Sequence, residues 1–159
     1  MIYIIEQDLL LSDCEIICHQ ANCEMVMGSG IAKSIKEKYP LAYEADRNFE
    51  LKGNARFGQF SFAKQDKTYI VNLYGQLRYR RKGEPPSRKT SYLMLSKAIH
   101  KMLVKIKEWE RVEGRELKLG MPYNIGCGRA GGDWHVVVAL IEELSYLHKK
   151  DIYLYKLSN

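Results

Sequence analysis

The chain has 159 residues, of which 46% are hydrophobic and 28% are charged, and its formal net charge at pH 7 is +6. This length suits one globular domain, residues 1–159, that buries roughly two-thirds of the surface exposed by its unfolded chain. No apolar run approaches the roughly 20 residues of a membrane-spanning helix. The apolar run 2–5 is too short for a secretory signal, because Glu6 and Asp8 follow it. We therefore expect a cytoplasmic protein.

The four cysteines contain no Cys-x-x-Cys pair, and their spacing matches neither a zinc ribbon nor a zinc finger. They are Cys14, Cys18, Cys23 and Cys127. We expect buried, reduced thiols, no metal site and no cofactor.

The positive charge is concentrated in one segment, because residues 78–89 hold six Lys and Arg side chains against the single Glu84. Three interpretations stay open: a solvated loop, a surface that steers phosphate groups into a nearby site, and a nucleic-acid surface. The nucleic-acid interpretation is the weakest, since only Tyr79 and Tyr92 flank the run. A loop as long as 75–89 is usually functional or mobile, so we expect it to border the site.

Short apolar runs alternate with helical periodicities, which is the pattern of a sheet covered by helices. In chain order, the expected elements are a strand at 1–6, a strand at 15–19, an amphipathic helix at 30–39, a short helix at 40–51, strands at 59–63 and 69–74, a long helix at 91–110, a strand at 116–121, a helix from Trp134, and a strand at 152–157. The helix at 30–39 follows from Ile31, Ile35 and Tyr39, which recur every four residues. The sequence therefore predicts an α/β fold.

A first glycine loop, Met-Gly-Ser-Gly-Ile-Ala at 27–32, follows the second strand and opens a helix. Residues without a Cβ let the backbone approach a ligand closely, and the first N–H groups of a helix attract an anion. The predicted ligand residues here are Met27, Gly28, Ser29, Gly30 and Ile31.

A second glycine loop, Asn-Ile-Gly-Cys-Gly-Arg-Ala-Gly-Gly at 124–132, follows the fifth strand and precedes the Trp134 helix. It offers unpaired N–H groups and the cation of Arg129. Both loops stand at carboxyl ends of strands, where open α/β sheets bind ligands, so we expect one diphosphate to bridge them. Tight turns and helix caps are the simpler alternative. The predicted ligand residues here are Gly126, Cys127, Gly128, Arg129 and Ala130.

The glycines of the second loop also satisfy the Gly-x-Gly-x-x-Gly spacing of dinucleotide-binding folds. That fingerprint normally opens the first βαβ unit and needs an acidic residue about 20 positions later, at the end of the next strand. Asp151 instead stands where the next strand begins. Neither loop ends in Gly-Lys-Ser/Thr, so a nicotinamide dehydrogenase and a P-loop triphosphatase are both disfavoured.

At these loops the sequence resembles the macro domain family. Residues 19–23 (His-Gln-Ala-Asn-Cys) with 27–32 look like the family's first ligand loop, and 121–128 (Met-Pro-Tyr-Asn-Ile-Gly-Cys-Gly) looks like its second. The loop variants are nearest to the branch of the terminal ADP-ribose protein glycohydrolase. The resemblance implies a three-layer α/β/α sandwich on a mixed sheet that binds ADP-ribose.

The resemblance also implies roles for residues outside the glycine loops. Asp8, with Leu9 beside it, stands where the family has an Asp that accepts a hydrogen bond from the adenine amino group. Asn22 matches the Asn that contacts the distal ribose. Tyr155 offers an aromatic wall beside adenine, although a core tyrosine is the simpler interpretation.

Catalysis at the distal ribose needs a positioned nucleophile or an activated water. The glycohydrolase that the chain resembles uses a Lys after the central strand and an Asp in the second loop. The matching positions here are near Gly75 or Gln76, and Ala130, so both groups are missing. The remaining candidates are His19, Asp133, Cys23, Glu24 and a lysine of 75–89. Of these we name His19 and Asp133 as catalytic, while a structural histidine and a helix cap are their simpler roles.

Three functions follow as hypotheses. The first is a hydrolase acting on an ADP-ribose derivative, such as an ADP-ribosylated protein or nucleic acid, ADP-ribose 1″-phosphate or O-acetyl-ADP-ribose. The second is a non-catalytic ADP-ribose reader, and the third is a nucleic-acid-binding domain. The missing Lys and Asp favour the reader or an uncommon hydrolytic route, whereas a domain without a fused module favours the enzyme. The hydrolase is the leading hypothesis, and the reader is its alternative.

Overall fold

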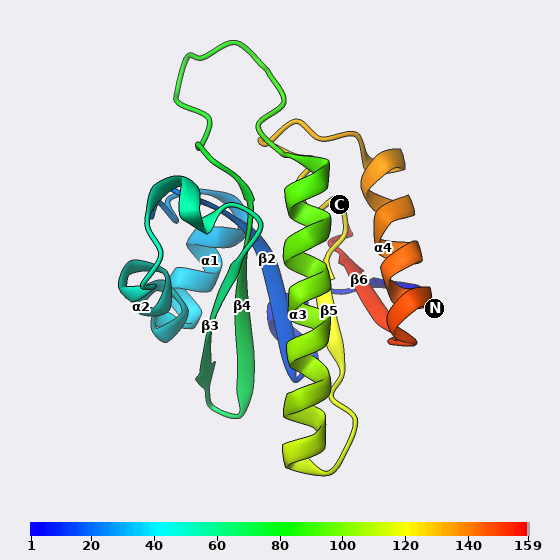
Figure 1. Cartoon of the computed structure of the whole chain (residues 1–159). Helices are drawn as coiled ribbons and strands as arrows, with labels where there is room; N and C mark the ends of the chain where they lie inside the picture. The colour runs from blue at the N-terminus through cyan, green and yellow to red at the C-terminus, as the bar shows by residue number, and fades with distance from the viewer. Residues whose placement is uncertain (159) are drawn as a thin grey trace.

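The computed structural model describes residues 1–158. Six strands form one sheet in the order β1-β6-β5-β2-β4-β3 (Figure 1). Neighbouring strands are parallel, except that β3 is antiparallel to β4 at one edge. The mixed sheet of the predicted α/β fold is therefore confirmed. The strands are β1 (Ile2–Glu6), β2 (Ile16–Asn22), β3 (Phe60–Gln65), β4 (Thr68–Gln76), β5 (Leu119–Pro122) and β6 (Ile152–Lys156).

Helices cover both faces of this sheet, which makes the predicted three-layer sandwich. Residues alternate between the faces along β2, so that Ile16 and Cys18 pack with α3 (Tyr92–Glu113) and α4 (Trp134–His148). Ile17 packs on the opposite face, with α1 (Gly30–Lys38) and α2 (Pro40–Asn48). Figure 1 views the sheet with α3 in front of it. No helix within residues 1–158 is both long enough and apolar enough to cross a membrane.

The predicted helices and strands are present in the structure, but their first and last residues differ from the predicted ones. Asp133 caps α4, one of the two roles predicted for it, by accepting a hydrogen bond from the N–H of His135. Ser91 caps α3 by accepting a hydrogen bond from the N–H of Met94. Strands β2 and β4 run further than predicted, to Asn22 and Gln76. Two short 3-10 helices, η1 (Leu9–Leu11) and η2 (Gly53–Arg56), were not predicted.

A buried ion pair lies between α2, η2 and β4. The Asp46 and Arg56 side chains are 1% and 0% exposed, and Arg56 Nη1 lies 2.8 Å from Asp46 Oδ1. The hydroxyl of Tyr74 donates to the same oxygen over 2.6 Å. Burial raises the pKa of Tyr74, so its phenol stays protonated and keeps this donor role. The pair is therefore held by several hydrogen bonds inside the protein.

A candidate ligand cleft

Two joined hollows open at the carboxyl ends of the parallel strands. The larger has a volume of about 610 Å³, and both glycine loops line it. The smaller has a volume of about 340 Å³ and lies beside η1 and the end of β6. Four residues line both hollows: Ile31, Pro122, Tyr123 and Asn124. The two hollows therefore adjoin, and each has a volume typical of small-molecule sites. We call the two together the cleft.

The first glycine loop presents the N-terminus of α1 to the larger hollow. Ser29 is the N-cap residue, yet its side chain makes no capping hydrogen bond. Outside the helix, the N–H groups of Gly28 and Ser29 have no hydrogen-bond partner within residues 1–158. These free N–H groups, with those of the first helical turn, form a positive end that attracts an anion.

The second glycine loop is folded so that several of its N–H groups stay free. The N–H of Cys127 donates to Asn124 over 2.8 Å, and the N–H of Gly132 donates to Gly126 over 3.0 Å. The N–H groups at positions 126 and 128–130 have no partner within residues 1–158. Since positions 126 and 128–130 line the same hollow as Ser29, both loops can donate to one bound anion.

The backbone conformation and the close packing of the second loop require a glycine at position 131. Gly131 has a φ of 73°, and a Cβ added there would lie 2.7 Å from the backbone oxygen of Ser87. We expect Gly131→Ala to lower the free energy of unfolding by about 1–3 kcal/mol. The measurement is urea unfolding at pH 7.

Gly128→Ala is the matched control, because no heavy atom lies within 4 Å of its added Cβ. That variant should unfold at the wild-type urea concentration. Equal stabilities of the two alanine variants would mean that the loop does not pack against Ser87 in solution.

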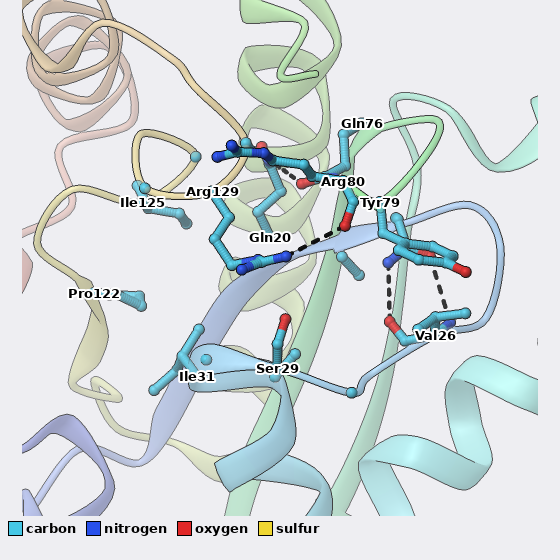
Figure 2. Close-up of a pocket in the computed structure, with 18 of the residues that line it drawn as sticks. Gln20, Val26, Ser29, Ile31, Gln76, Tyr79, Arg80, Pro122, Ile125 and Arg129 are labelled. Carbon is cyan, nitrogen blue, oxygen red and sulfur yellow. Dashed lines mark hydrogen bonds between the residues drawn. The ribbon is translucent and has the colours of Figure 1, made fainter. Parts of the chain in front are cut away.

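Three cations line the larger hollow, namely Arg80, Lys82 and Arg129. Arg129 Nη2 donates to the carbonyl of Arg80 over 3.3 Å, and Figure 2 shows this side chain reaching across the hollow. Within residues 1–158, no Asp, Glu, His or Cys lines this hollow. Two other cations of the run 78–89 are paired, Arg81 with Glu24 and Lys89 with Glu84. The run therefore borders the cleft, as expected, and gives it a positive lining.

Most of the predicted ligand residues line the cleft. Those on the larger hollow are Asn22, Gly28, Ser29, Gly30, Ile31, Gly126, Gly128, Arg129 and Ala130. Those on the smaller hollow are Asp8, Leu9 and Tyr155, with Ile31 shared. Their contacts with a ligand remain predictions.

Two of the predicted ligand residues, Met27 and Cys127, do not line either hollow. Met27 is 3% exposed and packs in the core between α1 and the sheet. Cys127 packs against the core on the other face, where burial raises the pKa of its thiol to about 11. Burial also raises the pKa of Cys23 to about 11, so neither thiol is ionised at neutral pH.

A direct catalytic role for His19 does not fit the structure. Its side chain is fully buried in β2, and its Nε2 lies 2.7 Å from Oδ1 of Asn72. Burial lowers the pKa of His19, which keeps the ring neutral. The strand alternation places Ile17 and His19 on the same face, and His19 lines neither hollow. His19 is therefore a structural residue of the core.

Asp133 has the simpler of its two predicted roles. Its carboxylate accepts the N–H of His135 over 2.9 Å as the cap of α4, and Asp133 lines neither hollow. Its own N–H donates to the hydroxyl of Tyr92 over 2.9 Å. Asp133 therefore shapes the end of the second loop.

Several cleft residues were not predicted, chiefly Gln20, Gln76 and Tyr79. Gln20 Nε2 donates to Gln76 over 2.7 Å and to Thr90 over 2.8 Å, and Thr90 in turn donates to the carbonyl of Gly126. These bonds link β2 and β4 to the second glycine loop. The sequence signals for this part of the site were the resemblance of 19–23 to a ligand loop and the expected length of the loop after β4.

Comparison with known proteins identifies the fold. The chain matches the macrodomain of Mycobacterium tuberculosis DarG with a TM-score of 0.78 and 22% identity over 99% of each chain. A macrodomain protein from Streptomyces coelicolor matches with a TM-score of 0.72 and 20% identity over 98% of each chain. The chain therefore has the macrodomain fold, in agreement with the resemblance seen in the glycine loops.

Two further proteins are similar to this chain. Thermosipho africanus DarTG, solved in complex with ADP-ribose, matches with a TM-score of 0.73 and 20% identity over 98% of this chain and 41% of that longer one. Among curated proteins, an uncharacterized 17.5 kDa protein of the tk-vs intergenic region of Enterobacteria phage T4 is 25% identical over 134 residues, covering 81% of this chain and 79% of that one. No family model matches the sequence.

Proposed function

We propose that the protein binds ADP-ribose or a derivative of it along the joined hollows. The adenosine lies in the smaller hollow, the diphosphate lies between the two glycine loops, and the distal ribose lies at the far end of the larger hollow. The observation that carries this proposal is that both glycine loops line one hollow, which continues into a second one.

The chemistry of the lining supports a diphosphate between the loops. Free N–H groups, a helix N-terminus and the Arg129 guanidinium all favour an anion at this place. The structural neighbour from Thermosipho africanus, solved with ADP-ribose, supports the same class of ligand.

The smaller hollow suits adenosine. Oδ1 of Asp8 accepts the N–H of Leu10 over 2.9 Å, which fixes the carboxylate and leaves its second oxygen to accept the adenine amino group. Tyr155 lines the same hollow. Burial and the Cys14 thiol raise the pKa of Tyr155 to about 12, so its ring is a neutral wall at physiological pH.

Calorimetry with ADP-ribose tests the proposal. We expect wild-type protein to bind with micromolar affinity, which corresponds to about −8 kcal/mol. Asp8→Asn keeps the acceptor for Leu10 but places an amide NH₂ against the adenine amino group. The variant should therefore bind ADP-ribose and AMP roughly 10- to 100-fold more weakly, as expected for loss of a hydrogen bond to a charged group.

Glu37→Gln is the matched control, since Glu37 is exposed on α1 and lines neither hollow. It should bind like wild type. Absence of binding heat at millimolar ADP-ribose with wild-type protein would reject the proposal. Wild-type affinity in Asp8→Asn would instead place the adenosine outside the smaller hollow.

Hydrolysis at the distal ribose is the second candidate, and Lys82 favours it. Cleavage there needs a nucleophile or a base, and Lys82 is the lysine that lines the larger hollow in residues 1–158. Because carboxylates and imidazoles are missing from that lining, binding without turnover is our first proposal.

A release assay separates the two candidates. The protein is incubated with mono-ADP-ribosylated protein, ADP-ribose 1″-phosphate and O-acetyl-ADP-ribose, and free ADP-ribose is measured. Release that is lost in Lys82→Gln supports the hydrolase. No release from any of the three, with ADP-ribose binding intact, supports the reader.

A further inference from the structure

Residues 77–91, which connect β4 to α3, form a strap that is fastened to the first glycine-loop region by Glu24. Oε1 of Glu24 accepts the N–H of Tyr79 over 3.0 Å, and its Oε2 lies 2.8 Å from Nη2 of Arg81. The Arg81 guanidinium also stacks over the Tyr79 ring at 4.4 Å from its centre. The Arg81 pairing lowers the pKa of Glu24, so the carboxylate is ionised at neutral pH. Tyr79 is therefore held through both its backbone and its ring.

The other end of the strap is fastened to the second glycine loop. The N–H groups of Lys89 and Thr90 both donate to the carbonyl of Ala130, over 2.7 and 3.1 Å. The strap thus connects the two loops of the cleft, and its conformation depends on residues far apart in the sequence. Tyr79 and Lys82 face the larger hollow from it.

Tyr79 stands at the end of the larger hollow that lies away from the smaller one. Figure 2 shows Pro122 and Ile31, which line both hollows, at one end, and Tyr79 with Val26 at the other. Ser29 and Arg129 lie between these ends. If the diphosphate lies at Ser29 and the adenosine lies beyond Ile31, the group attached to the other side of the diphosphate lies at the Tyr79 end of the hollow.

We propose that Tyr79, positioned by Glu24 and Arg81, forms the wall that selects a sugar beyond the diphosphate, so that the cleft prefers ADP-ribose to ADP. This inference rests on the proposed function. An aromatic ring gives a sugar a flat apolar surface, and the backbone bond to Glu24 keeps that surface in place without a ligand. Glu24 acts through Tyr79 and is a positioning residue.

The test compares dissociation constants for ADP-ribose and ADP by calorimetry. Wild-type protein should prefer ADP-ribose by about tenfold or more. Tyr79→Ala should bind ADP-ribose about tenfold more weakly while its affinity for ADP stays within about twofold, because ADP does not reach the ring. Tyr79→Phe keeps the ring and should keep the preference.

Glu24→Ala should also lower the preference for ADP-ribose over ADP, whereas Glu84→Ala should not change it. Glu84 lies on the same strap but pairs with Lys89 and does not line the hollow. Retained ADP binding shows that a variant is folded, and Tyr79→Leu replaces Tyr79→Ala if the latter binds neither ligand.

The outcomes separate the inference from the proposed function. An unchanged preference in Tyr79→Ala, or equal weakening of both ligands, overturns the role of Tyr79 and leaves ADP-ribose binding standing. Wild-type protein that binds neither ligand overturns the proposed function itself.

Discussion

Gly128→Glu is expected to abolish ADP-ribose binding while the protein stays folded. Gly128 lines the larger hollow, and an added Cβ meets no heavy atom within 4 Å, so a longer side chain has room in the hollow where we propose that the diphosphate binds. Two like charges about 4 Å apart near a protein surface repel by about 4 kcal/mol, which corresponds to roughly 1,000-fold in affinity. Calorimetry at low salt measures this loss.

Gly128→Gln separates charge from bulk in this experiment. It has the same shape as the glutamate variant but lacks the charge, so it should lose much less affinity. Because the repulsion is electrostatic, the gap between the two variants should narrow as salt is added. Tight binding by Gly128→Glu would mean that no phosphate lies beside this loop.

Asp46→Ala is expected to lower the free energy of unfolding by about 3–5 kcal/mol, since it leaves the buried Arg56 guanidinium without its counter-charge. This is a large share of the stability of a typical domain. The same change removes the acceptor of the Tyr74 hydroxyl. Urea unfolding at pH 7 measures the loss.

Glu44→Ala is the control on the same helix. Glu44 is exposed, and its removal should change stability by about 0.5 kcal/mol or less. The double variant Asp46→Leu with Arg56→Met should recover much of the loss, because it removes both charges together. A loss below about 1 kcal/mol in Asp46→Ala would contradict the ion pair as a main support of α2.

The glycine loops were predictable because their chemistry is local. Positions such as Ser29 and Gly128 depend on a strand end, a turn and a helix start that lie within about ten residues of each other. Helix caps such as Asp133 were predictable for the same reason. The mixed sheet followed from the resemblance to the macro domain family, whereas the order of its strands was not predicted.

The residues that the sequence did not reveal depend on distant partners. His19 was predicted to end the second strand, but β2 continues to Asn22, and the partner of His19 is Asn72 on β4. Gln20 reaches the cleft beside an irregularity in the β2 register between Ala21 and Asn22. No local pattern encodes such a shift, because it requires knowing how β2 pairs with β4.

The side-chain positions of the strap also depend on partners that are distant in the sequence. The basic run was visible in the sequence, but nothing local distinguishes Arg81, which pairs with Glu24, from Arg80, which lines the hollow. The partner of Arg81 lies 57 positions earlier in the chain. The charge of this segment therefore predicted that it lies beside the site. Which of its side chains line the hollow depends on the tertiary structure.

A crystal structure of the protein with ADP-ribose tests the central claim most directly. We predict that diphosphate oxygens lie within about 3.2 Å of N–H groups from both 28–31 and 126–130, with the adenine beside Asp8. A diphosphate that contacts only one of these loops, or a ligand bound outside the joined hollows, would contradict the account.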